Sequence, residues 1–151
     1  MKVFGQAAFV ILLASAFGPP GALCGALCSC NWERDPLKAR DGAAVVVEGL
    51  ALDSTLSAPA LHVVNGHQWF QVRVVVRNRW KGSVPDTIVV RTTEPAGGCG
   101  FSFHGGQRYL LFLSKDTSSG LSATMCSLSQ PFSEAESVIR KLGPPLRKGA
   151  A

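Results

Sequence analysis

The sequence lacks the compact motifs that mark the common enzyme classes. It contains no nucleophile elbow, no phosphate-binding loop and no dinucleotide-binding fingerprint. Its 10 carboxylates are scattered along the chain, and no pair of them has a spacing suited to acid–base catalysis. These absences predict a protein that is not an enzyme, has no catalytic residues and requires no cofactor.

Histidine is scarce, with three in 151 residues, and none lies at zinc-ligand spacing from a cysteine or a carboxylate. His62, His67 and His104 therefore read as exposed loop residues. The Cys28-Ser29-Cys30 segment has the form of half a metal site, but no second closely spaced pair accompanies it. The sequence predicts no metal site of the protein's own.

Long hydrophobic runs are also missing. The clearest apolar run, residues 9–14, is too short for a membrane span, which needs about 20 residues. Lys2 precedes this run and the breaker Gly-Pro-Pro-Gly follows it at 18–21, as in a secretory signal peptide and unlike a buried helix. We predict a signal peptide over residues 1–26 and a protein that is secreted, either extracellular or periplasmic, with no transmembrane segment.

The position of cleavage leaves alternatives open. A cut after Ala26 puts small residues at the two recognition positions, whereas a cut directly before Cys28 puts Leu27 at the last of them. A lipoprotein signal would instead acylate a cysteine that follows a small residue, and Ser29-Cys30 is the nearest match.

Charged residues make up only 17% of the chain, and the formal net charge is +5. Loss of Lys2 with the signal peptide leaves 14 basic and 10 acidic residues, a net charge of +4. This mild excess is weak support for nucleic-acid binding. No nucleic-acid partner is predicted, and the chain is expected to be a monomer.

Cysteine is informative because export permits disulfides. The chain has five cysteines, and removal of Cys24 with the signal peptide leaves four, which allow three pairings. A bridge between Cys28 and Cys30 would be strained because one residue separates them. Each is therefore expected to reach forward, to Cys99 or to Cys126, and the sequence alone does not choose between these two arrangements.

Short strands dominate the rest of the chain. Residues 69–80 alternate, with Val72, Val74 and Val76 on one face and charged or polar residues on the other, which is the pattern of a half-buried strand. Trp69, Phe70 and Trp80 are expected to pack in the core. Further strands are predicted at residues 43–52, 87–93, 108–113 and 121–126, with a loop or frayed hairpin at 53–66.

One helix is predicted, near the end of the domain. Ser133 and Glu136 have the spacing of a capping box, and Ala135, Val138, Ile139 and Leu142 follow at helical spacing before Gly143. Residues 31–42 are polar and contain Pro36, which predicts a loop, and the basic residues 144–151 are predicted to form a disordered tail.

Five or six strands followed by a helix predict an all-β domain over residues 27–143. Closing the sheet into a barrel would remove its exposed edges, so a five- to six-stranded barrel with a C-terminal helix and two disulfides fits best. A β-sandwich is the alternative at this level.

The order and spacing of several motifs resemble the inhibitory N-terminal domain of the tissue inhibitors of metalloproteinases. Cys28-Ser29-Cys30 follows the signal peptide, and the next cysteines come 71 and then 27 residues later. Trp80-Lys81-Gly82 resembles the end of the family's long strand. The motif at 98–101 resembles its Cys-Gly-aromatic segment, and residues 109–113 and 121–127 resemble its last strands.

This resemblance implies an OB-fold barrel of the netrin-like type with the disulfides Cys28–Cys99 and Cys30–Cys126. It also implies a binding wedge for zinc metalloendopeptidases. The wedge comprises Cys28, Ser29, Cys30, Ala96, Gly97, Gly98 and Cys99.

In that family the amine and carbonyl of the first cysteine chelate the zinc of the protease, a role that falls here to Cys28. A free Cys28 amine requires cleavage after Leu27. The alternatives are a netrin-like module that binds protein or glycan, and a lipid-anchored envelope protein, neither of which is an inhibitor.

Overall fold

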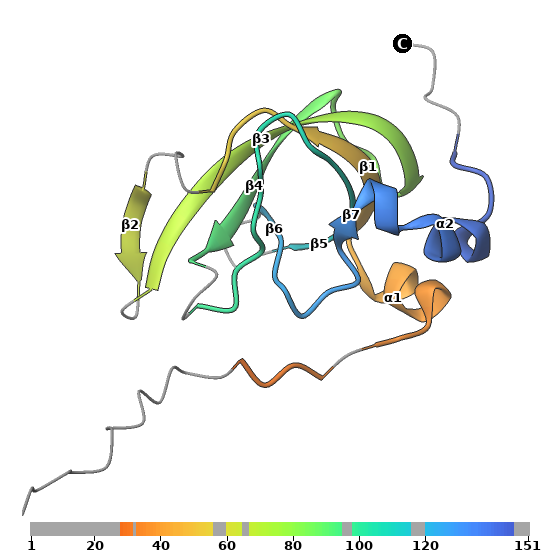
Figure 1. The fold of residues 1–151 in the computed structure, drawn as a ribbon, viewed down its shortest axis with the longest axis horizontal. Coiled ribbons are helices and arrows are strands. Elements are labelled where there is room, and N and C mark those ends of the chain that lie inside the picture. The colour runs from red at the N-terminus through yellow and green to blue at the C-terminus, as the bar shows by residue number, and fades with distance from the viewer. Residues whose placement is uncertain are drawn as a thin grey trace, which may run out of the picture.

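The computed structural model describes residues 28–31, 33–55, 60–64, 67–94, 98–115 and 120–146, with the backbone alone for 60–64 and 67. The predicted signal peptide lies outside these residues, as do Ala96 and Gly97 of the predicted wedge. Two helices and a curved sheet make up the described chain (Figure 1).

Five strands close into a barrel. They are β1 (Val45–Ala51), β3 (His67–Lys81), β4 (Thr87–Thr93), β5 (Arg108–Lys115) and β6 (Leu121–Ser122). The hydrogen-bonded order is β1-β3-β4-β6-β5, and pairing of β5 with β1 completes the ring. The β4–β6 pair is parallel and the other pairs are antiparallel, so the barrel is mixed. The prediction of an all-β barrel with two disulfides and a C-terminal helix is confirmed.

Two short strands lie beside the ring. β2 (Ala60–Val64) pairs with β3, in agreement with the frayed hairpin that the sequence allowed, and β7 (Gln130–Pro131) pairs with β5. The predicted last strand is shorter than expected, since β6 ends at Ser122 and only an isolated bridge joins Thr124 to Gly100.

Alternating residues of the long strands fill the barrel. Val72, Val74 and Val76 are buried as predicted, and β4 adds Ile88 and Val90. An aromatic cluster lies at one end of this core, with ring centroids 4.9–5.4 Å apart in edge-to-face contacts. It consists of Phe101, Phe103 and Tyr109.

A second apolar cluster lies outside the barrel, beneath the helices. Trp80 is buried there with Val46 and Leu142, and its indole N–H donates to the carbonyl of Gly143 over 2.8 Å. The prediction that Trp80 packs in the core is confirmed. Trp69 and Phe70 are only half-buried, because they lie at the end of β3 where the strand extends to pair with β2.

The loop predicted at residues 31–42 contains a helix, α1 (Pro36–Gly42). Asp35 is its N-cap and accepts from the N–H groups of Leu37 and Lys38 at 2.8 and 3.4 Å. These backbone hydrogen bonds lower the pKa of Asp35. Pro36, taken as a loop signal, occupies the start of the helix, where its missing N–H costs nothing.

The C-terminal helix is present as α2 (Glu136–Leu142), but the predicted capping box is wrong. Ser133 lies in a 3-10 turn, η1 (Phe132–Glu134), and the N-cap is Ala135, which makes no side-chain capping bond. Ala135 is fully buried in the outer cluster, so packing sets the start of the helix. Glu136 pairs instead with Arg140 at 2.8 Å.

The predicted disordered tail, 144–151, needs correction for its first three residues. The chain continues beyond α2 along the barrel, and the N–H of Leu146 donates to the carbonyl of Arg79 over 2.6 Å. Residues 147–151 lie outside the described chain.

Trp80 should contribute most to holding α2 on the barrel, because it shares an apolar cluster with Leu142 and its indole bonds to Gly143. We expect Trp80→Ala to lower the free energy of unfolding by about 3–5 kcal/mol, as for other buried tryptophans. Urea unfolding of the oxidised protein measures this. Val89→Ala is the control, because Val89 is 47% exposed on β4 and its truncation should cost under about 0.5 kcal/mol. Equal losses in the two variants would contradict this role.

Candidate functional site

The leading segment of the described chain, residues 28–31, is termed the strap. Two disulfides join it to the barrel, Cys28–Cys99 and Cys30–Cys126, with Cα–Cα distances of 5.6 and 5.1 Å. Both distances are normal for disulfides. The pairing implied by the family resemblance is confirmed. The alternative, in which Cys28 and Cys30 are half of a metal site, does not hold because both sulfurs are bridged.

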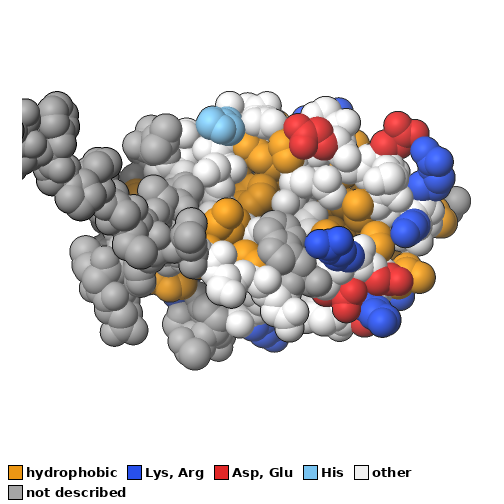
Figure 2. All heavy atoms as spheres, turned by 60° about the horizontal axis from the view of Figure 1, so that its bottom comes forward, with side chains coloured by type: hydrophobic (Ala, Val, Ile, Leu, Met, Phe, Trp, Pro, Cys, Tyr) orange, Lys and Arg blue, Asp and Glu red, His pale blue; other side chains and the backbone are white. Residues whose placement is uncertain are grey.

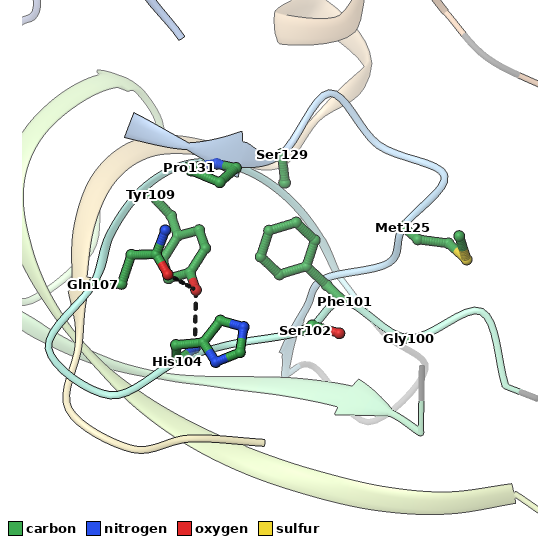
Figure 3. A pocket seen from close by; sticks show the side chains of 9 residues that line it. All are labelled: Gly100, Phe101, Ser102, His104, Gln107, Tyr109, Met125, Ser129 and Pro131. Carbon is green, nitrogen blue, oxygen red and sulfur yellow. Dashed lines mark hydrogen bonds between the residues drawn. The ribbon is translucent and has the colours of Figure 1, made fainter. Parts of the chain in front are cut away.

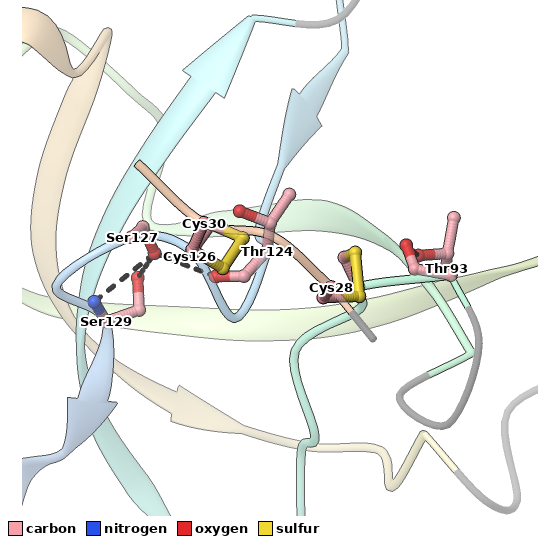
Figure 4. The surroundings of a disulfide bond; sticks show 9 residues. Cys28, Cys30, Thr93, Thr124, Cys126, Ser127 and Ser129 are labelled. Atoms are coloured by element: carbon pink, nitrogen blue, oxygen red, sulfur yellow. Dashed lines mark hydrogen bonds between the residues drawn. A yellow bond between two sulfur atoms is a disulfide. The ribbon is translucent and has the colours of Figure 1, made fainter. Parts of the chain in front are cut away.

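The two disulfides are the strap's main attachment to the barrel. Among the residues that the structure describes, no hydrogen bond joins the strap to the barrel. Both cysteines of the strap are half-buried, whereas Ser29 between them is exposed. Figure 4 shows the two bridges in succession along the strap, the first near Thr93 and the second near Thr124. The strap therefore presents Ser29 to solvent from a backbone pinned on either side.

The segment that receives Cys28 is packed tightly against the end of β4. The N–H groups of Gly98 and Gly100 both donate to the carbonyl of Glu94, at 3.1 and 3.3 Å, and the hydroxyl of Thr93 donates to the carbonyl of Gly98. Cys99 has a φ of +58°, in the left-handed region. A Cβ atom on Gly100 would lie 1.8 Å from the carbonyl oxygen of Thr93, so only glycine fits there.

The segment that receives Cys30 is fixed to the first one. The N–H of Met125 donates to the carbonyl of Cys99 over 3.0 Å. On its other side, the Ser127 hydroxyl donates to the carbonyl of Thr124 and to the hydroxyl of Ser129, at 2.9 and 2.8 Å. Ser129 in turn accepts from a backbone N–H of β5. The strap and its two anchoring segments together form one braced surface, here termed the ridge (residues 28–30, 98–100 and 124–126).

The sequence matches no protein-family model, and no curated protein is significantly similar to it. The ridge is therefore interpreted from its own geometry.

Five of the seven predicted wedge residues meet in the ridge. They are Cys28, Ser29, Cys30, Gly98 and Cys99. The sequence predicted Cys126 only as a disulfide partner, and it gave no role to Thr124 or Met125. The Cys30–Cys126 disulfide and the Met125–Cys99 hydrogen bond bring these two residues into the ridge. The signal that could have found them is their position directly before Cys126.

The chemistry of the ridge is that of backbone groups and uncharged side chains. In the described part of the chain no three His, Cys, Asp or Glu residues are grouped to hold a metal ion. Glu33, the first carboxylate after the strap in the sequence, accepts from the backbone N–H of Asp35 at 2.9 Å. No helix among these residues has the length and apolarity to cross a bilayer.

The second disulfide should matter greatly for stability because it closes a loop of 96 residues. Replacement of the pair by Cys30→Ser and Cys126→Ser together should lower the free energy of unfolding by about 2–5 kcal/mol. Urea unfolding without reductant measures the loss. The Ser114→Ala, Ser122→Ala double variant, which removes an exposed hydroxyl pair elsewhere, should stay near wild type. An unchanged midpoint in the cysteine variant would contradict the prediction.

Gly100 should tolerate no side chain. We expect Gly100→Ala to cost about 1–3 kcal/mol of unfolding free energy, because the backbone of Thr93 must move. Gly42→Ala is the matched control, since a Cβ at that position meets nothing within 4 Å. Thermal unfolding followed by circular dichroism compares the two, and equal stability would show that the close approach at Gly100 is not limiting.

Proposed function

We propose that this chain is a secreted inhibitor of zinc metalloendopeptidases, similar to the tissue inhibitors of metalloproteinases, with the ridge as its binding wedge. One observation carries the proposal: two disulfides hold a short strap on a closed barrel, with Ser29 exposed between them. Inhibitors insert rigid extended segments into clefts, and this strap has the rigidity without needing a bound partner.

The first residue of the strap supplies the chemistry. With Cys28 as the mature N-terminus, its neutral α-amine and its carbonyl oxygen are two ligands for a protease zinc. A catalytic zinc has three protein ligands and an open position for water. Ligands from Cys28 take that position and exclude the water that the metal would activate. Ser29 then lies beside the metal, toward the pocket that selects substrate side chains.

Rigidity supports tight binding. When a flexible segment binds, each side chain that becomes immobilised costs about 0.5–1.5 kcal/mol of binding free energy. The strap is held in place before binding by bonds at Cys28 and Cys30, and its receiving segments are hydrogen-bonded to each other. Less ordering is left for the binding step, so more of the contact energy appears as affinity.

Export fits the same proposal. Disulfides form and persist in oxidising compartments, and the apolar leader predicted at 1–26 would deliver the chain there. Chelation sets a stricter condition on processing, because any residue before Cys28 converts its amine into an amide. The mature inhibitor must therefore begin at Cys28, which requires cleavage after Leu27, one residue beyond the predicted signal peptide.

The start of the chain provides a direct test. We expect protein that begins at Cys28 to inhibit one or more members of a panel of zinc metalloendopeptidase catalytic domains. A matched form that begins at Leu27 should be weaker by at least ~100-fold, equivalent to about 2.8 kcal/mol of lost zinc coordination. Inhibition constants from peptide hydrolysis measure the difference, and Nα-acetylation of the Cys28 form should reproduce it.

Each outcome separates the alternatives. Equal potency of the Cys28, Leu27 and acetylated forms would rule out chelation, and absence of inhibition by all of them would favour the netrin-like binding module. Mass spectrometry of the natural mature protein without reduction reads its first residue. An acylated cysteine there would favour the lipid-anchored protein.

A further inference from the structure

A hollow of about 470 Å³ opens directly beside the ridge (Figure 3). Gly100 and Met125, which belong to the ridge, form part of its wall. Phe101 and Tyr109 of the aromatic cluster lie at its base, and Pro131 of β7 closes the far side. The hollow therefore continues the surface that the two disulfides define.

The base of the hollow is rigid and its polar groups are occupied. The Tyr109 hydroxyl accepts from the backbone N–H of His104 at 2.9 Å and donates to the Gln107 side chain at 3.1 Å. Burial raises the pKa of Tyr109. Ser129, another wall residue, already bonds to the backbone of β5. These partners leave little polar capacity in the base for a ligand.

The hollow also carries no formal charge from acidic or strongly basic side chains. None of its nine lining residues is Asp, Glu, Lys or Arg. Figure 2 shows one face of the molecule, on which hydrophobic side chains gather beside a histidine and most of the visible charged side chains lie toward the right. A charged group placed in the hollow would lose water without gaining an opposite charge. The lack of charge therefore favours an uncharged group, and the aromatic rings at the base favour an apolar one.

The hollow is too open to retain a free small molecule. Sites for such ligands bury 70–90% or more of the ligand's surface. Here Ser102 and His104 are exposed, and Met125 is 42% exposed. An open apolar hollow can instead receive a side chain that belongs to a larger partner. The other contacts of that partner then keep the side chain in place. An exposed methionine is well suited to line such a contact, because its thioether is flexible and polarisable.

We propose that the hollow receives an uncharged aliphatic or aromatic side chain from the rim of the active-site cleft of the protease bound by the ridge. This inference rests on the proposed function. Entry of the strap into the cleft brings the adjoining protein surface toward the hollow, since Gly100 and Met125 are shared by both. The hollow then discriminates among metalloproteases, favouring those with an apolar residue at that rim position and disfavouring those with a charged one.

The test adds a charge to the hollow and, separately, fills it. Met125→Lys places an ammonium group at its rim, and Ser102→Trp places an indole at its exposed wall. The matched controls are Leu52→Lys and Ser83→Trp, because Leu52 is 44% exposed, Ser83 is an exposed loop serine, and neither residue lines the hollow. All four changes are at exposed or partly exposed positions, and circular dichroism and thermal unfolding check that each variant folds.

The assay uses the Cys28-started protein and the catalytic domain that it inhibits most strongly in the panel. We expect Met125→Lys and Ser102→Trp each to raise the inhibition constant by at least ~10-fold, while the controls change it by less than about 2-fold. A chelating strap that still binds would leave residual inhibition in both hollow variants.

The outcomes separate the hollow from the zinc-binding strap. If the hollow variants match wild type while the Leu27-started form is weak, the hollow proposal is overturned and chelation stands. If the hollow variants are weak while the Leu27-started form is not, the hollow is supported and chelation is overturned. Equal losses in the hollow variants and their controls overturn the hollow proposal, and absence of inhibition by wild type overturns both.

Discussion

Two sulfur–sulfur bonds determine where the strap, the first described segment of this chain, lies on the barrel. Without them, the described strap has no hydrogen bond to hold it on the barrel. In the chain-entropy view, loops of 71 and 96 residues each contribute about 4–5 kcal/mol by restricting the unfolded chain. Each contribution is a large share of the 5–15 kcal/mol that is the usual free energy of unfolding of a domain.

The barrel makes these bonds useful because it gives them fixed end points. Cys99 and Cys126 lie on irregular segments, yet the Met125–Cys99 hydrogen bond and the close approach of Gly100 to Thr93 hold those segments together. The same segments wall the hollow at the aromatic end of the core. Stability and the proposed binding surface therefore depend on one set of contacts, and a change in either is expected to affect the other.

Much of the fold could be predicted from periodicity. The alternation of Val72, Val74 and Val76 predicted the longest strand. Every second side chain of a β-strand points to the same face, so all three valines can face the core. α1 was missed because Pro36 was taken as a loop signal, although proline with an acidic N-cap before it is equally typical of a helix start. The capping box failed because burial of Ala135 outweighed the local preference of an exposed Ser133.

The site was predictable in part. Spacing alone left two pairings for Cys28 and Cys30, and it was the family resemblance that implied the observed one. Neither spacing nor resemblance indicated the hollow, since its nine lining residues come from separate loops and strands and share no pattern. Such a surface exists only after the barrel has brought residues 100–109 beside residues 125–131.

The direction of the two crosslinks has a consequence for biosynthesis. During synthesis, the thiols of Cys28 and Cys30 are made before those of their partners, which follow 71 and 96 residues later. At about 5–20 residues per second, the two intervals last about 4 to 19 seconds. Throughout them, two thiols one residue apart have no native partner and are open to capture by each other, by a third cysteine or by an oxidant. Correct pairing therefore requires that these two thiols remain exchangeable until the segments that carry Cys99 and Cys126 have been made.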